Sequence, residues 1–202
     1  YTFDDLTSGL AGETFKIKRS YNSHDITENH FNIGWTFNYE GKAEYLTLVD
    51  GDTEEPKTII AIRMPDGTNL HFEEYIYDDG QIKFFPMDSR AELRRNEDSK
   101  YLSVTTPDQT KYCFYPVKEP STSQSAVDTF ANIDSPGCLY KIVDKYGNST
   151  DINWRRGKIT DITDAAGNTY TFTYDSNKLI SISDAFGRSV TYTYNGSTLI
   201  QS

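Results

Sequence analysis

Apolar and polar residues alternate along much of this sequence. Residues 169–174 alternate threonine with an aromatic residue, and residues 189–194 repeat this alternation with Val, Tyr and Tyr between serines and threonines. A period of two places one kind of side chain on each face of a β-strand. Residues 179–183 alternate again and predict the returning strand of a hairpin. The pattern therefore predicts strands with one aromatic face and one hydroxyl face.

The same residue types recur every 20 residues between positions 138 and 202. An Asp, a Gly, an aromatic residue and an aliphatic residue share this spacing, namely Asp144, Asp164 and Asp184; Gly147, Gly167 and Gly187; Trp154, Tyr174 and Tyr194; and Leu139, Ile159, Leu179 and Leu199. Each Asp-x-x-Gly segment predicts a tight turn, because the carboxylate can accept bonds from backbone N–H groups two or three residues on and Gly takes the positive φ. We therefore expect about three 20-residue β-hairpin repeats over 138–202.

Strands and tight turns are also predicted through residues 1–137, without the repeat. The predicted strands cover residues 14–20, 31–40, 43–49 and 58–64. Hairpin turns are predicted at residues 65–68 and 78–80, where Asp-Gly suits the turn positions. A bend is expected at Gly34.

Two segments depart from this pattern. Residues 119–137 are rich in Ser and Thr and do not alternate, so we expect a loop there that separates the non-repeating region 1–137 from the repeats. Residues 88–95 form the only segment compatible with a short helix. The predicted fold class is all-β, with antiparallel hairpins in a curved, extended sheet.

Composition and charge narrow the possible functions. The chain has 15 Tyr and 11 Phe, which favour strands, and its net charge of −10 is the sum of about −11 in residues 1–138 and about +1 in residues 139–202. An acidic chain without a basic stripe is unsuited to nucleic-acid binding. No apolar run approaches the ~18–20 residues of a membrane span, so no membrane insertion is expected. Because the chain starts without Met and ends inside a repeat unit, we interpret it as part of a longer polypeptide.

Two motifs resemble the Rhs/YD-repeat family. Tyr174-Asp175 and the turn at 164–168 resemble the family's YD repeat, and residues 19–23 followed by 34–40 resemble the opening of the Rhs core. The similarity runs from about Thr14 to the end of the chain. It has departures, because the segment from Tyr174 to Leu179 is one residue shorter than usual and Asn32 stands where the family has Gly. Trp154-Arg155 and Tyr194-Asn195 also replace Tyr-Asp.

The resemblance implies a structural role. It implies a long β-sheet that coils into a shell around a C-terminal toxin or effector, with this chain as a non-enzymatic part of the wall. The protein would be extracellular or at the cell surface or cell wall. Its partners would be the remainder of the same polypeptide, including further YD repeats and the toxin cargo. No cofactor and no metal are expected.

Two other functions stay open. Trp154, Tyr174 and Tyr194 could stack into an exposed platform for a cell-surface glycan, which would make the chain a carbohydrate-binding adhesion module, or they could lock adjacent hairpins together. A glycoside hydrolase would need two carboxyl groups roughly 5–10 Å apart. Nothing in the sequence distinguishes the acidic pairs Glu73-Glu74 and Asp78-Asp79 from ordinary exposed hairpin ends.

The remaining metal-binding and redox candidates are weak. His24, His30 and His71 lack the spacing of a metal site, and residues 50–54 lack the order of acidic and glycine positions that a calcium loop requires. Cys113 and Cys138 could form a disulfide in a secreted chain, or Cys113 could be a small core residue.

Overall fold

Every regular element that the structure describes is a β-strand, which confirms the all-β prediction. The computed structural model describes residues 2–10, 13–21, 23, 34–49, 56–96, 99–117, 134–196 and 198–201. The chain forms two compact units. The first unit comprises Tyr1–Glu40 with Thr150–Ser202, and the second unit is Gly41–Ser149. These units follow tertiary contacts, whereas the division into 1–137 and 138–202 follows the sequence repeat and stays a prediction.

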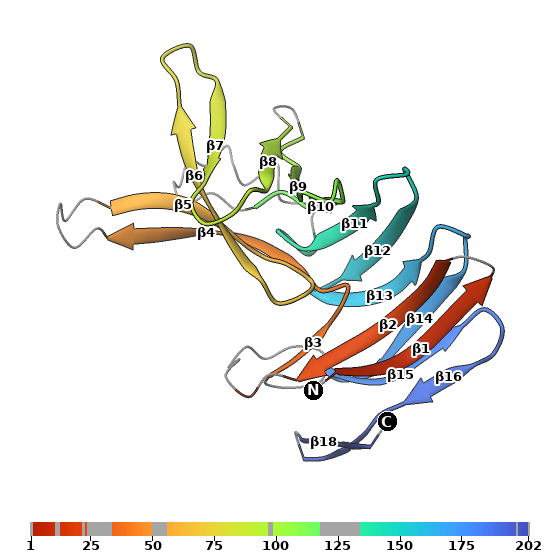
Figure 1. Ribbon diagram of the computed structural model, residues 1–202. Coiled ribbons are helices and arrows are strands. Elements are labelled where there is room, and N and C mark those ends of the chain that lie inside the picture. Colours follow the sequence, from red (N-terminus) through yellow and green to blue (C-terminus); the bar gives the residue numbers. More distant parts are fainter. Residues whose placement is uncertain are drawn as a thin grey trace. The chain divides into compact units, whose positions relative to one another are not determined.

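The first unit begins with a three-stranded antiparallel sheet. Its strands are β1 (Thr2–Leu10), β2 (Glu13–Tyr21) and β3 (Trp35–Phe37), in that order (Figure 1). Strand β2 confirms the strand predicted at 14–20, whereas β1 was not predicted. The bend at Gly34 is confirmed, with φ at 83°.

The repeats form a run of antiparallel strands in which each strand pairs with the next. They are β12 (Ser149–Arg155), β13 (Lys158–Thr163), β14 (Thr169–Asp175), β15 (Lys178–Asp184) and β16 (Ser189–Thr191), with a separate pair β17 (Thr193–Asn195) and β18 (Thr198–Gln201). Tyr170 and Phe172 are buried whereas Thr171 and Thr173 are exposed, so the alternation in sequence is an alternation of faces. The predicted hairpins are confirmed, and their identity as YD repeats stays a prediction.

Aromatic side chains form the core of the first unit. The ring centroid of Phe15 on β2 lies 4.4 Å from that of Tyr170, and the Phe37 centroid lies 5.5 Å from that of Phe172. Tyr170, Phe37 and Phe172 are all buried. The N-terminal sheet therefore covers the aromatic face of the repeat strands and removes it from water, which is the main favourable contribution to folding.

The second unit contains two antiparallel series of strands (Figure 1). The first is a four-stranded sheet of β4 (Lys42–Val49), β5 (Pro56–Arg63), β6 (Asn69–Ile76) and β7 (Ile82–Pro86). The second is the run β8 (Glu92–Arg95), β9 (Leu102–Thr105), β10 (Lys111–Phe114) and β11 (Leu139–Val143). The predicted strands 43–49 and 58–64 and both predicted hairpins are confirmed. Ile60, Ile62, Phe72 and Phe114 form part of the core.

The helix expected at 88–95 is wrong. Residues 92–95 form β8, where Leu93 lies opposite Val104 of β9 and both side chains are buried. Leu93 can be buried this way because its neighbours Glu92 and Arg94 point to the opposite face. Most of the loop expected at 119–137 lies outside the described residues. Within the described part of the chain, no helix is long and apolar enough to span a membrane.

Candidate functional site

Each residue of the predicted aromatic ladder lies at an irregularity in a hairpin. Trp154, Tyr174 and Tyr194 are half-buried, and the strand register shifts immediately before each of them. The residues opposite them are Ile159, Leu179 and Leu199. A β-bulge bends its strand and redirects one side chain, so the 20-residue repeat in sequence is also a repeat of bulges.

A lysine covers each tyrosine of the ladder. The Nζ atom of Lys158 lies 5.2 Å from the centre of the Tyr174 ring, and that of Lys178 lies 5.4 Å from the centre of the Tyr194 ring. Lys158 donates a hydrogen bond to the carbonyl of Ser176, and Lys178 makes the equivalent bond with Gly196. We call this arrangement the lysine clamp. It combines cation–π attraction with a charge-assisted hydrogen bond.

Sequence analysis missed the clamp, although Lys158 and Lys178 share the 20-residue spacing. The Tyr194 hydroxyl also donates to the carbonyl of Leu179 at 2.7 Å, and burial raises the pKa of Tyr194 to about 12. Burial likewise raises the pKa of Tyr174. One ring face of each tyrosine therefore carries a lysine. A glycan-binding role for Trp154, Tyr174 and Tyr194 stays a prediction.

The three Asp-x-x-Gly turns form where they were predicted, but each carboxylate accepts from N–H groups two and four residues further on, not two or three. In each, one carboxylate oxygen of Asp144, Asp164 or Asp184 accepts bonds from the N–H groups two and four residues further on, at 2.8–3.0 Å. The glycines have φ between 83° and 89°. Burial alone raises the pKa of Asp144, but bonds from Asn148 and the backbone outweigh it and hold the pKa below its usual value.

The same backbone turn recurs in the non-repeating region. At residues 64–68, 77–81 and 106–110, the first N–H donates to the fifth carbonyl and the fourth N–H donates to the first carbonyl, as in the Asp-x-x-Gly turns. Here the carboxylate sits at the third position and accepts from the fifth N–H, through Asp66, Asp79 or Asp108. One turn geometry therefore accepts two placements of Asp. Because the Asp stands at the third position of these turns and at the first position of the repeat turns, the sequence does not show that the turns are alike.

A buried ion pair links the ends of the chain within the first unit. Nε of Arg19 donates to Asp5 at 2.9 Å, and the Tyr192 hydroxyl donates to the other oxygen of Asp5, also at 2.9 Å. The Arg19 guanidinium carbon lies 4.9 Å from the centre of the Phe3 ring and 5.1 Å from that of Trp35. Burial raises the pKa of Asp5, and the charge of Arg19 opposes this shift. We call Asp5, Arg19 and Tyr192 the first cluster.

The second unit contains a cluster of the same chemistry. Arg95 contacts Glu74 at 3.1 Å, and the Tyr45 hydroxyl donates to Glu74 at 2.9 Å while it accepts from Arg95 at 2.8 Å. The Arg95 guanidinium carbon lies 5.6 Å from the centre of the Phe84 ring. Tyr45, Glu74 and Arg95, which we call the second cluster, connect strands β4, β6 and β8.

Structural partners are found for three of the carboxylates considered for hydrolysis, Glu73, Glu74 and Asp79. Glu73 forms an ion pair with Lys57 at 2.7 Å, whereas Glu74 belongs to the second cluster. Glu73 and Glu74 are neighbours on β6 and therefore point to opposite faces of the sheet. Asp79 accepts from the N–H of Gln81 in its turn.

The other candidates give no metal site among the described residues. A ring nitrogen of His71 lies 2.6 Å from Asp88, whose pKa is lowered by this hydrogen bond. Within the described ranges, no group of three or more His, Cys, Asp or Glu side chains is placed to hold a metal ion. His24, His30 and residues 50–54 lie outside those ranges. Cys113 and Cys138 are both buried and are not joined in a disulfide.

Comparison of the chain with protein-family models and with curated proteins gives no match.

Proposed function

We propose that this chain is a non-enzymatic structural segment of a secreted or cell-surface YD-repeat protein, in which it forms part of a β-shell around a C-terminal toxin or effector. The lysine clamp carries the proposal, because it recurs with the sequence period at Lys158 and Lys178. Lys158 fastens β13 to the turn that follows β14, and Lys178 fastens β15 to the turn that follows β17. Such a sheet can grow one hairpin at a time.

The distribution of side chains on the repeat strands supports this role. One face carries buried aromatic and aliphatic residues, and the other carries Thr and Ser. Antiparallel sheets commonly pack one face on a core and expose the other to water, and a wall can be built from such a sheet. The partners in this proposal are the remainder of the same polypeptide and its cargo.

The aromatic ladder fits a packing role better than a binding role. A sugar that stacks on a ring needs a free ring face. Lysines lie over Tyr174 and Tyr194, and the Tyr194 hydroxyl is already bonded to the backbone. Carboxylates at Glu74 and Asp79 are likewise bonded within the fold, which supports a structural rather than a hydrolytic role.

The modular character of the repeats can be tested by adding a unit. A second copy of residues 158–177 is inserted after position 177, so that the new unit carries its own lysine and tyrosine. We expect a folded protein with more strand signal in circular dichroism and a urea midpoint no lower than that of the parent, because each added hairpin brings a new interface. Loss of folding on insertion would contradict a repeating wall.

The shell itself can be tested by protease protection. The longer polypeptide that carries this chain is digested under native conditions and compared with its C-terminal region expressed alone. If the shell encloses this region, we expect cleavage of the enclosed region to be slower by at least an order of magnitude, because proteases require access to an opened segment. Equal cleavage rates would exclude the shell role.

A further inference from the structure

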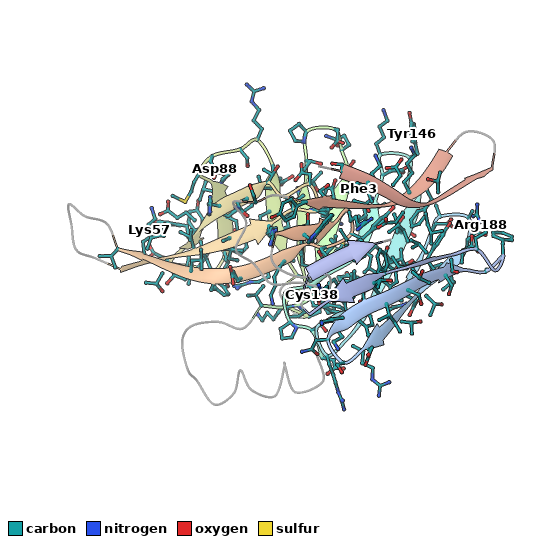
Figure 2. The ribbon with its side chains drawn as sticks, turned by 90° about the horizontal axis from the view of Figure 1, so that it is seen from below. Phe3, Lys57, Asp88, Cys138, Tyr146 and Arg188 are labelled. Atoms are coloured by element: carbon teal, nitrogen blue, oxygen red, sulfur yellow. The ribbon has the colours of Figure 1, made fainter. Side chains whose placement is uncertain are left out.

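The outer edge of strand β4 is open over residues 46–49. Strand β4 stands at one end of its four-stranded sheet and pairs with β5 on one side only. On its other side, Lys42 at the start of the strand bridges Cys138. Further along this edge, no other strand that the structure describes pairs with β4. Figure 2 labels Cys138 at the covered end and Lys57, which lies opposite Leu48 near the open end.

The strand register shows which backbone groups face the open edge. In an antiparallel pair, every second residue bonds the neighbouring strand, and the residues between point their N–H and C=O groups the other way. The Ala43 N–H donates across the outer edge to Gly137, and the pairing of β4 with β5 has no register shift. Thr47 and Val49 therefore also point their backbone groups outward. Another extended strand can pair with such an edge.

The side chains of the open stretch are apolar or uncharged and reach water. Leu46, Leu48 and Val49 are 37%, 41% and 69% exposed. Natural proteins usually protect an edge strand with charged residues, proline or a bulge. The edge strands β1, β7 and β8 have such protection, because β1 is bulged, β7 contains a lysine and a proline, and β8 is mostly charged. The open stretch of β4 has none of these features.

The sequence of this stretch is nearly a palindrome. Residues 45–49 read Tyr-Leu-Thr-Leu-Val, with a leucine on each side of Thr47. A two-fold axis through Thr47 would set threonine opposite threonine, each Leu46 opposite a Leu48, and each Tyr45 opposite a Val49. Thr–Thr pairs and pairs of an aromatic with a β-branched residue stabilise antiparallel strands. The leucine pairs would remove exposed apolar surface from water.

Other positions of the axis fit less well. Edge-to-edge pairing about a two-fold axis keeps each side chain on its own face of the sheet, so the axis can pass through any residue of β4. An axis through Leu46 would set Glu44 opposite a leucine, and an axis through Leu48 would carry the pairing past Val49, where β4 ends. The axis through Thr47 pairs only uncharged residues, which suits contact between two chains that each carry a charge of −10.

We propose that β4 binds a second copy of this chain, by antiparallel pairing of residues 45–49 about a two-fold axis at Thr47. The tip of the β4–β5 hairpin would gain most, since β5 pairs with β6 only from Ile59 onward. A ribbon of two strands is marginally stable in water, and the contact would widen it to two strands from each copy. The contact requires only β4 and does not depend on the shell role proposed above.

Sedimentation velocity over a range of concentrations tests the proposal. We expect the wild type to show a reversible monomer–dimer equilibrium. Thr47→Lys should weaken it by about tenfold or more, because two like charges then meet at the axis while the bonds between β4 and β5 stay intact. Thr173→Lys is the matched control. It makes the same change at an exposed threonine of β14, which has a strand on both sides, and should leave the equilibrium unchanged.

A charge-swap experiment tests the position of the axis. Thr47→Glu alone should weaken the dimer as Thr47→Lys does, whereas an equal mixture of the two variants should form dimers again, because opposite charges then face each other. Added salt should strengthen the wild-type dimer, in which both chains are acidic, and weaken the mixed dimer.

Four results would overturn the proposal. They are a wild type that stays monomeric at millimolar concentration, a dimer that Thr47→Lys leaves intact, an equal loss in Thr173→Lys, and a mixture that associates no better than its components. Near-ultraviolet circular dichroism shows that each variant is folded, so that loss of the dimer can be assigned to the edge of β4.

Discussion

The two units bury the same three chemical groups to different extents. Arg19 and Asp5 of the first cluster are 6% and 3% exposed, whereas Arg95 and Glu74 of the second cluster are 8% and 14% exposed. Tyr192, Phe3 and Trp35 surround the Arg19 guanidinium with aromatic rings. The guanidinium of Arg95 has a ring contact with Phe84. Water can therefore compensate a lost partner more readily in the second cluster.

The clusters also differ in how far apart their members lie in the sequence. Asp5 and Tyr192 are 187 residues apart, whereas Tyr45 and Arg95 are 50 apart. Contacts between distant residues cost more chain entropy to form. The first cluster therefore holds β1 against the far end of the chain, and the second cluster joins strands that already lie close together in the sequence.

The largest expected difference between the units follows from removing each arginine. Arg19→Ala leaves the Asp5 carboxylate buried without its ionic partner, which we expect to lower the free energy of unfolding by about 3–5 kcal/mol. Arg95→Ala leaves the better-hydrated Glu74, for which we expect about 1–3 kcal/mol. Urea denaturation followed by fluorescence measures both.

The exposed Arg94 provides the control for this pair. Arg94 bonds Glu92 at 2.8 Å, but its side chain is 73% exposed, so Arg94→Ala should change stability by less than about 0.5 kcal/mol. The double variant Asp5→Leu with Arg19→Met should recover much of the stability lost in Arg19→Ala, because no buried charge remains. Equal losses in Arg19→Ala and Arg95→Ala would show that burial does not distinguish the clusters.

A second pair of substitutions compares glycines at positive φ in the two units. Gly137 has φ of 71°, and an added Cβ would lie 2.1 Å from the carbonyl oxygen of Ala43. Gly167 has φ of 84° and nothing within 4 Å of an added Cβ. We expect Gly137→Ala to cost roughly 3 kcal/mol or more, from overpacking and backbone strain together, and Gly167→Ala to cost about 1–2 kcal/mol from strain alone.

Thermal unfolding of the two alanine variants distinguishes these causes. The Ala43 N–H donates to the Gly137 carbonyl at 2.7 Å, so displacement of Gly137 would also break this bond. Amide exchange at Ala43 should therefore increase in Gly137→Ala and stay unchanged in Gly167→Ala. A loss in Gly167→Ala as large as that in Gly137→Ala would contradict the role of the close approach.

Removal of each cluster's tyrosine hydroxyl has a smaller expected effect. Tyr192→Phe deletes a donor to the buried Asp5, and a bond to a charged group contributes about 1.5–3 kcal/mol. Tyr45→Phe deletes one donated and one accepted bond, but water can reach Glu74, so we expect about 1 kcal/mol. The urea midpoints of both variants measure the difference. A larger loss in Tyr45→Phe would mean that the number of bonds matters more than burial.

The sequence predicted local structure better than it predicted these clusters. Alternation and Asp-x-x-Gly spacing placed β12 to β15 and their turns correctly, because both signals arise from the geometry of a few neighbouring residues. Strand β1 was not predicted, because apolar and polar residues do not alternate regularly in its sequence, TFDDLTSGL. Its register shift between Asp4 and Leu6 explains this, since a bulge breaks the period of two.

The clusters depend on tertiary contacts that no local pattern reveals. Arg19 stands in a segment that the sequence predicts only as a strand, and its burial against Asp5 becomes visible only in the structure. Trp154, Tyr174 and Tyr194 lie at equivalent positions of their hairpins, and their role stays a prediction. The lysines of this aromatic ladder could have been found, because Lys158 and Lys178 share its spacing.

The weakest expected effects are two slopes of stability against pH, which have opposite signs in the two units. Asp144 in the second unit has a lowered pKa, so its contribution to stability is complete above 3.8 and is lost as the pH falls below that value. Asp5 in the first unit has a raised pKa. Its contribution is complete below 3.8 and is lost as the pH rises through the raised pKa, because the folded state binds the proton more tightly.

Asparagine variants separate these slopes, since neither Asp5→Asn nor Asp144→Asn can titrate. The stability of the wild type minus that of Asp144→Asn should decrease below pH 3.8, and the same difference for Asp5→Asn should decrease above it. Urea midpoints across the acidic range give both curves. Parallel curves would mean that the charge of Arg19 lowers the pKa of Asp5 by more than burial raises it. The two clusters would then differ only in how far apart their members lie in the sequence.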